Sequence, residues 1–192
     1  KTLAINVGLP EKKIHIIHPG HDEPIDIEKK FINESKKQDN TKSVMTANQA
    51  VDSTLVHLKL DPDKFEIAIL ACDDEKIREL NFQFRGINNK TNILSWPEKD
   101  LSPKVSGTMP MKPEPINREP VFLGNLAISF EFIIKEAKKL NKDFYNHLYH
   151  LISHGTLHLL GFVHDLELDA KIMENKEREI LSKVGIADPY SN

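Results

Sequence analysis

Three histidines between residues 154 and 164 have the spacing of ligands to one metal ion. His154 and His158 are four residues apart in a segment predicted to be helical, so their side chains project from the same face, one turn apart. Gly161 follows, and since glycine readily adopts the left-handed conformation that ends helices, the chain is predicted to turn there and deliver His164 to the same ion. Three histidine ligands leave a fourth position for water. This is the pattern of a catalytic zinc site, where the pKa of water falls to roughly 7.

The residue after His154 bears on the type of chemistry. The spacing of the histidines matches the H-E-x-x-H-x-x-G-x-x-H pattern of metzincin proteases, in which the glutamate is the general base. Gly155 stands in the place of that glutamate, which disfavours a peptidase. A metal hydrolase that acts on phosphodiesters can instead stabilise the developing charge with the metal and a cation.

The composition indicates one globular domain over residues 1–192. The 192 residues are 39% hydrophobic and 29% charged, with a net charge of −3, which suits a single core. The mild acidity argues against a generally basic nucleic-acid binder but leaves room for a local basic cleft. The single cysteine, Cys72, excludes an internal disulfide and fits a reducing compartment. No apolar stretch approaches the ~20 residues of a membrane span, so we expect a cytoplasmic protein without a membrane partner.

Hydrophobic periodicity predicts an α+β fold, in which a small mixed β-sheet is covered by helices and the metal site lies on a C-terminal helix. Polar composition predicts a surface loop over residues 36–42, and six of the 11 prolines predict a longer one over residues 97–120. His147 and His150 are interpreted as part of a polar helix face. The predicted strands are 13–17, 65–71, 91–96 and 121–129, and the predicted helices are 24–35, 44–59, 74–83, 130–141, 144–160 and 167–184.

Two further blocks lie upstream of the histidines. The first is Leu80-Asn81, Phe84-Arg85-Gly86 and Thr91-Asn92-Ile93-Leu94-Ser95-Trp96, and the second is Leu123-Gly124-Asn125-Leu126-Ala127-Ile128-Ser129. They resemble the L-N-x-x-x-R … T-D-V-L-S-F and L-G-D-I-x-I-S blocks of the YbeY family, and the histidine run resembles that family's H-G-x-L-H-L-x-G-…-H signature. The order and spacing of the three blocks agree over roughly residues 60–185. The YbeY proteins are bacterial endoribonucleases that act in ribosomal RNA maturation.

The resemblance implies a single α/β domain, one zinc ion per chain at His154, His158 and His164, and single-stranded RNA as substrate. Ribosomal RNA, and the ribosome or its associated proteins, are the implied partners. The implied function is a metal-dependent, single-strand-specific endoribonuclease in ribosomal RNA maturation and ribosome quality control.

The resemblance also implies that Arg85 is a functional cation near the metal. Arginine suits that role because its planar guanidinium holds a phosphate bidentately and never loses its charge. The alternative for Arg85 is a surface ion pair with Glu79 or another acid. Ser95 and Trp96, at the end of a predicted strand, are weaker candidates for substrate contact. Trp96 could stack on a base or serve as a core aromatic.

The sequence departs from the family pattern at three positions. The family usually has Asp where this chain has Asn92, Asn125 and Val163. Carboxylates near a metal often orient the ligating histidines, so the change at Val163 removes a candidate for that role. Asp165 follows the last ligand and could replace it.

Four functions fit these observations. They are a zinc-dependent endoribonuclease, a metallopeptidase of unusual type, a non-catalytic zinc protein that docks on the ribosome or a GTPase, and another metal hydrolase on the same scaffold. Gly155 disfavours the peptidase, while the lost aspartates keep the non-catalytic protein open.

Overall fold

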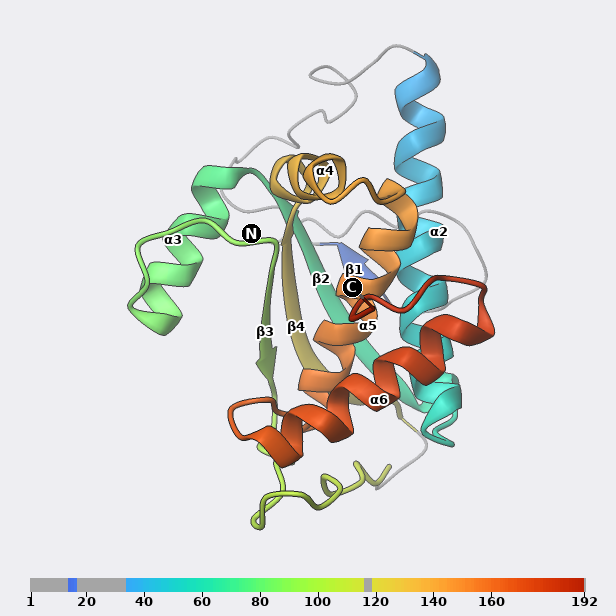
Figure 1. Ribbon diagram of the computed structural model, residues 1–192, viewed down its shortest axis with the longest axis vertical. Coiled ribbons are helices and arrows are strands. Elements are labelled where there is room, and N and C mark those ends of the chain that lie inside the picture. Colours follow the sequence, from blue (N-terminus) through green and yellow to red (C-terminus); the bar gives the residue numbers. More distant parts are fainter. Residues whose placement is uncertain (1–13, 17–33, 116–118, 192) are drawn as a thin grey trace.

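A four-stranded mixed sheet forms the centre of the computed structural model, which describes residues 14–16, 34–115 and 119–191 (Figure 1). Its strand order is β1-β2-β4-β3. The three strands β1 (Ile14–Ile16), β2 (Phe65–Cys72) and β4 (Val121–Ser129) run parallel, and β3 (Ile93–Pro97) pairs antiparallel with β4 at the edge. The predicted α+β fold with a small mixed sheet is therefore confirmed.

Helices cover both faces of this sheet. They are α2 (Glu34–His57), α3 (Asp74–Arg85), α4 (Phe130–Lys139), α5 (Phe144–Leu159) and α6 (Glu167–Lys183), with a short 3₁₀ turn η1 (Pro62–Lys64) before β2. α5 packs on one face, flanked by α2 and α6, while α3 packs on the opposite face (Figure 1). No helix in the described part of the chain is both long and apolar enough to cross a membrane.

The alternation of side chains along β4 divides the core into two parts. Leu126 and Ile128 point toward α5 and join the larger cluster, whereas Ala127 lies between them and packs with Ile77 of α3. This follows from the two-residue period of a strand, which sends neighbouring side chains to opposite faces. Fully burying an Ile or Leu side chain stabilises a fold by about 1.5–3 kcal/mol, so the larger cluster makes α5 the best-anchored helix.

The predicted loop over residues 36–42 is wrong, because α2 runs through it. This stretch is polar but contains no proline or glycine, and polar residues such as Lys and Gln are good helix formers. Periodicity detects only the apolar face, which in α2 starts after this stretch with Ala47, Ala50 and Val51. Most of the predicted 24–35 helix lies outside the described residues. Residues 98–115 form neither helix nor strand.

Gly155 allows α5 to lie close to the sheet. A Cβ atom at this position would lie 2.7 Å from Ile93 Cδ1, 2.9 Å from Leu126 Cδ2 and 3.3 Å from Ser95 Oγ. Real Cβ atoms do not approach other atoms as closely as the first two distances. The glycine thus faces β3 and β4, and a side chain there would require the ends of the Ile93 and Leu126 side chains, or the helix itself, to shift.

We expect Gly155→Ala to lower the free energy of unfolding by about 1–3 kcal/mol through overpacking, although alanine is the better helix former. Asn146→Ala, at an exposed position of α5, is the control. It should change the free energy by less than about 0.5 kcal/mol. Urea unfolding of the metal-free proteins measures both effects. A Gly155→Ala protein as stable as wild type would mean that Ile93 and Leu126 can move aside at no cost.

Candidate metal centre

The fold brings the three predicted histidine ligands to one point. His154 and His158 project from the last turns of α5, and His164 comes from the connection to α6. The Nε2 atom of His158 lies 3.1 Å from that of His154 and 3.2 Å from that of His164. One nitrogen from each ring lies within 4.8 Å of the others. The triad can therefore hold a single metal ion.

A glycine turn returns the chain so that His164 reaches the other two histidines. Gly161 has a φ of 86°, in the left-handed region that glycine adopts without strain. A Cβ atom on Gly161 would lie 2.5 Å from the backbone carbon of Leu101 and 2.6 Å from its oxygen. The loop of residues 98–115 thus packs directly on the turn that carries the third ligand, and only glycine fits between them.

Hydrogen bonds on the far side of two rings determine which nitrogens face the centre. His154 Nδ1 lies 2.8 Å from Glu177 Oε1, and His158 Nδ1 lies 2.9 Å from the backbone oxygen of Phe162. Both oxygens are acceptors, so each Nδ1 carries a proton, and a ring in the neutral form required of a ligand presents a bare Nε2 lone pair. Two lone pairs 3.1 Å apart repel unless a cation lies between them. This donor arrangement fits a zinc-type ion.

His158 is also poised to remain uncharged. Burial, together with the neighbouring His154 and His164, lowers the pKa of His158 to about 4. Metal ligation requires neutral imidazole. His158 is therefore available as a ligand across the neutral and mildly acidic range.

Glu177 is a functional residue that the sequence analysis missed. Its side chain is only 1% exposed. Burial raises the pKa of Glu177, but hydrogen bonds from His150, His154 and Tyr190 outweigh it and hold the pKa far below its ordinary value. The carboxylate is therefore ionised behind the ligand His154. A signal was present, because Glu177 lies between Met173 and Ile180 on the buried stripe of α6, where acids are rare unless paired.

The interpretation of His147 and His150 as a polar helix face is wrong. His147 is buried, and its Nε2 lies 2.7 Å from Glu136 of α4. His150 Nε2 lies 2.6 Å from Glu177 Oε2. Both histidines thus point inward, where each pairs with an acid from a neighbouring helix.

Arg85 lies at the C-terminal end of α3 and is exposed. It forms no hydrogen bond or ion pair with any residue that the structure describes, and Glu79, the expected alternative partner, is paired with Lys76 at 3.1 Å. The guanidinium is thus not engaged by a described acid.

The other two candidates lie on opposite faces of β3. Ser95 faces α5, beside Gly155. Trp96 faces α3 and meets Phe84 edge-on, with 4.9 Å between the ring centroids. As the edge strand, β3 lies between the helix that carries Arg85 and the helix that carries His154 (Figure 1).

Comparison with known proteins identifies the family. Residues 29–185 match the family described as Endoribonuclease YbeY. A protein of that name from Jannaschia sp. is 46% identical over 144 residues, which cover 75% of this chain and 88% of the relative. Its namesakes from Ruegeria pomeroyi and Bartonella quintana are 44% and 38% identical, with 76% and 82% of this chain covered and 88% and 93% of the relatives.

The chain belongs to the YbeY family. The solution structure of a protein from Thermotoga maritima aligns with 79% of the chain and 93% of its own, at 17% identity and a TM-score of 0.46. That likeness is too weak to add to the assignment.

The departures from the usual YbeY pattern leave the triad supported. Asp165, the expected substitute for a carboxylate at Val163, is exposed and forms no hydrogen bond within the described residues. Glu177 supplies the carboxylate instead, from α6. Asn92 donates from Nδ2 to Glu136 Oε2 at 2.9 Å. An aspartate at that position would place a second negative charge beside Glu136.

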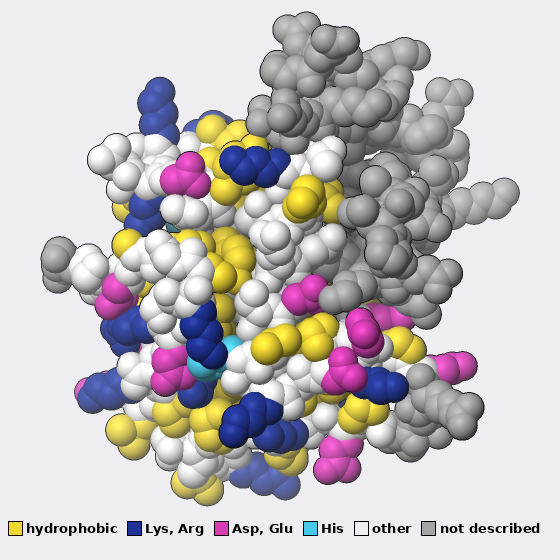
Figure 2. Space-filling view, turned by 90° about the vertical axis from the view of Figure 1, so that its right-hand side faces the viewer, with side chains coloured by type: hydrophobic (Ala, Val, Ile, Leu, Met, Phe, Trp, Pro, Cys, Tyr) yellow, Lys and Arg dark blue, Asp and Glu magenta, His cyan; other side chains and the backbone are white. Residues whose placement is uncertain are grey.

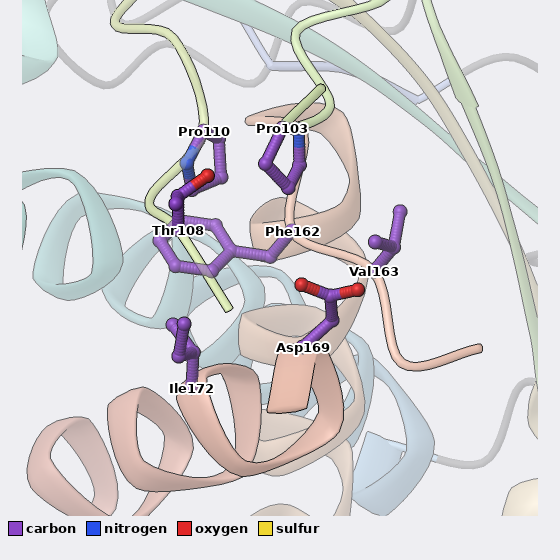
Figure 3. Close-up of a pocket in the computed structure, with 7 residues that line it drawn as sticks. All are labelled: Pro103, Thr108, Pro110, Phe162, Val163, Asp169 and Ile172. Carbon is purple, nitrogen blue, oxygen red and sulfur yellow. The ribbon is translucent and has the colours of Figure 1, made fainter. Parts of the chain in front are cut away.

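Val163 lines a small pocket behind the ligand-bearing connection (Figure 3). Pro103, Thr108 and Pro110 of the 98–115 loop form one side of it, and Asp169 and Ile172 of α6 form the other. The Asp169 carboxylate accepts a hydrogen bond from the Gly107 amide at 2.8 Å. The pocket therefore marks where the loop is fastened to α6.

Metal analysis is the direct test of the triad. We expect about one zinc ion per chain in the purified protein and loss of most of it in His158→Ala, because two imidazoles cannot replace three. His57→Ala is the control, since His57 lies on α2 and pairs with Glu179 and Lys183. Zinc should also dissociate in acid, because protons compete for the ligands, and the pKa of His158, lowered to about 4, predicts that this ligand is lost only well below neutral pH. Equal metal content in wild type and a triple His→Ala variant would exclude this site.

Proposed function

We propose that this YbeY-family chain is a zinc-dependent endoribonuclease that cleaves single-stranded RNA in ribosomal RNA maturation and ribosome quality control. One observation carries the proposal: three imidazole nitrogens converge in a chain that is 46% identical to a protein named an endoribonuclease. The expected partners are ribosomal RNA and the ribosome or its associated proteins, and the expected location is the cytoplasm.

Each residue of the centre has a separate task. His154, His158 and His164 would hold the ion, and the Glu177 carboxylate and the Phe162 carbonyl keep the first two rings in orientation. A zinc ion held there would supply a Lewis acid that generates a nucleophile from water near neutral pH. His164 is the exposed ligand of the three, so substrate would approach from its side.

The packing of α5 supports a phosphodiester over a peptide as substrate. A peptidase of this histidine spacing needs a glutamate at position 155, but a side chain at that position would meet Ile93 and Leu126. Glu177 cannot take over the role of base, since its oxygens accept hydrogen bonds from His154, His150 and Tyr190. Phosphodiester cleavage depends instead on stabilising charge, for which a metal and a cation suffice.

Arg85 is the proposed cation. Its guanidinium has no described acid partner, so it can hold a phosphate of the RNA bidentately. Trp96 contacts Phe84, the residue before Arg85, and we propose that Trp96 contacts the same RNA strand. Ser95, on the α5 side of β3, is a further proposed contact nearer the triad.

The surface charge is consistent with RNA binding on a restricted area. The described side chains in Figure 2 show Lys and Arg interspersed with Asp and Glu on that face, without a continuous basic surface. With a net charge of −3, the protein would rely on a few placed cations such as Arg85, not on a broad basic surface.

We expect Arg85→Ala to retain zinc and a wild-type melting curve while RNA cleavage falls by ~10²–10³, the usual effect of losing one preorganised donor to developing charge. Arg85→Lys should recover only part of the rate, because an ammonium group cannot bind bidentately. Arg78→Ala, on the same helix, is the control, since Arg78 is paired with Glu75 at 3.0 Å. Cleavage of a single-stranded RNA, with structured RNA and casein alongside, measures the effect.

Each alternative function predicts a distinct outcome in these cleavage assays. Wild-type cleavage by zinc-loaded Arg85→Ala would refute the role of Arg85. Zinc-loaded wild type that cleaves no RNA would favour the non-catalytic protein that docks on the ribosome or a GTPase. Cleavage of casein would favour the peptidase.

A further inference from the structure

The Glu177 carboxylate accepts three hydrogen bonds, which are divided between its two oxygens. Oε1 accepts from His154 Nδ1 at 2.8 Å. Oε2 accepts from His150 Nε2 at 2.6 Å and from the Tyr190 hydroxyl at 2.6 Å. The two donors on Oε2 fix the plane of the carboxylate, so that Oε1 points at the ring of a metal ligand.

Tyr190 reaches this carboxylate from the segment that follows α6, residues 187–191. Arg178 of α6 holds that segment in two ways: its Nε lies 3.2 Å from Asp188 Oδ2, and its guanidinium carbon lies 4.9 Å from the centre of the Tyr190 ring. The Asp188 side chain also accepts from the Tyr190 amide at 2.9 Å. The segment lies beyond residue 185, where the match to the YbeY family ends.

The hydrogen bond from Tyr190 to Glu177 matters to the metal centre even though Tyr190 is not a ligand. A buried carboxylate that loses one donor keeps its charge in a medium that solvates it poorly, so it turns toward the donors that remain. For Glu177 the remaining donors are the rings of His150 and His154. Loss of the Tyr190 hydroxyl would thus leave the orientation of His154 less well defined.

We propose that residues 187–191 act as a clamp on the metal centre, with Tyr190 positioning Glu177 and Glu177 positioning the ligand His154. The proposal rests on the metal centre of the proposed function. If docking of the clamp strengthens metal binding, then metal binding strengthens docking of the clamp by the same factor, because coupling between two sites is reciprocal.

Chelator competition with zinc tests the first half of this coupling. Glu177→Gln should weaken zinc binding about 10- to 100-fold, the usual effect of removing a group that orients a ligand. Tyr190→Phe keeps the ring on Arg178 and removes only the hydroxyl, so the loss should be smaller, about three- to tenfold. The controls are Asp165→Asn, which removes an exposed charge beside His164, and Tyr145→Phe, which removes a hydroxyl near the start of α5. Both should stay within about twofold of wild type.

Hydrogen–deuterium exchange tests the reciprocal half. Zinc should slow exchange of the Tyr190 and Ser191 amides, which both bond to Asp188, in wild type but not in Glu177→Gln. A purely structural role predicts a lower melting temperature in the variants with unchanged zinc Kd, and that result would overturn the proposal. If Glu177→Gln fails to fold, an unchanged Kd in Tyr190→Phe is sufficient to overturn it. Wild type that binds no zinc would instead refute the metal centre itself.

Discussion

The Nε2 atom of His158 lies within hydrogen-bond distance of the Nε2 atoms of His154 and His164, and the neutral rings of His154 and His158 have no proton to share there. The surrounding structure is organised around this constraint. Such a concentration of lone pairs is unfavourable unless a cation compensates it, so the rings must be held in place by other contacts. The Phe162 carbonyl and the Glu177 carboxylate provide them on the outer side of two rings. Both acceptors are far less exposed than the ligands they orient, which keeps water from competing for the same Nδ1 protons.

The rest of the fold supplies rigidity to these contacts. α5 carries two ligands, and it is fixed between the sheet, α2 and α6 by the larger hydrophobic cluster. The third ligand follows a turn that is closed by the backbone of Leu101, and Asp169 fastens the same loop to α6. A long irregular segment thereby becomes part of the support of the centre, although it contributes no ligand.

The parts of the site that could be predicted are those encoded by residues a few positions apart in the sequence. The separation of His154 from His158 and the position of Gly161 define one helical face and one turn, so the sequence alone indicated that His164 would join them. The alternating and buried strands were predicted for the same reason. Glu177, by contrast, meets His154 only because α5 and α6 pack together, and no local pattern encodes that contact.

The wrong predictions for the start of α2 and for His147 and His150 have the same origin, because local sequence patterns do not report contacts between helices. The sequence predicts a loop at the polar start of α2 because periodicity reports burial, and a helix can continue where nothing buries it. The sequence places His147 and His150 on a polar helix face because their partners, Glu136 and Glu177, belong to other helices. Polar and charged residues are exposed in most folds, but they can be buried where a residue of opposite charge pairs with them in the core.

The bare backbone of Gly155 also limits which catalysts could descend from this scaffold. A glutamate gained there would meet the side chains of Ile93 and Leu126, which would have to shift before it could serve any reaction. Making room by replacing either neighbour with a smaller residue opens a cavity in the core, at a cost of several kcal/mol for a change to alanine. The intermediate sequences would be less stable and no more active. Selection would therefore tend to keep proteins with this packing as phosphodiester hydrolases, because the route to a peptidase passes through less stable sequences.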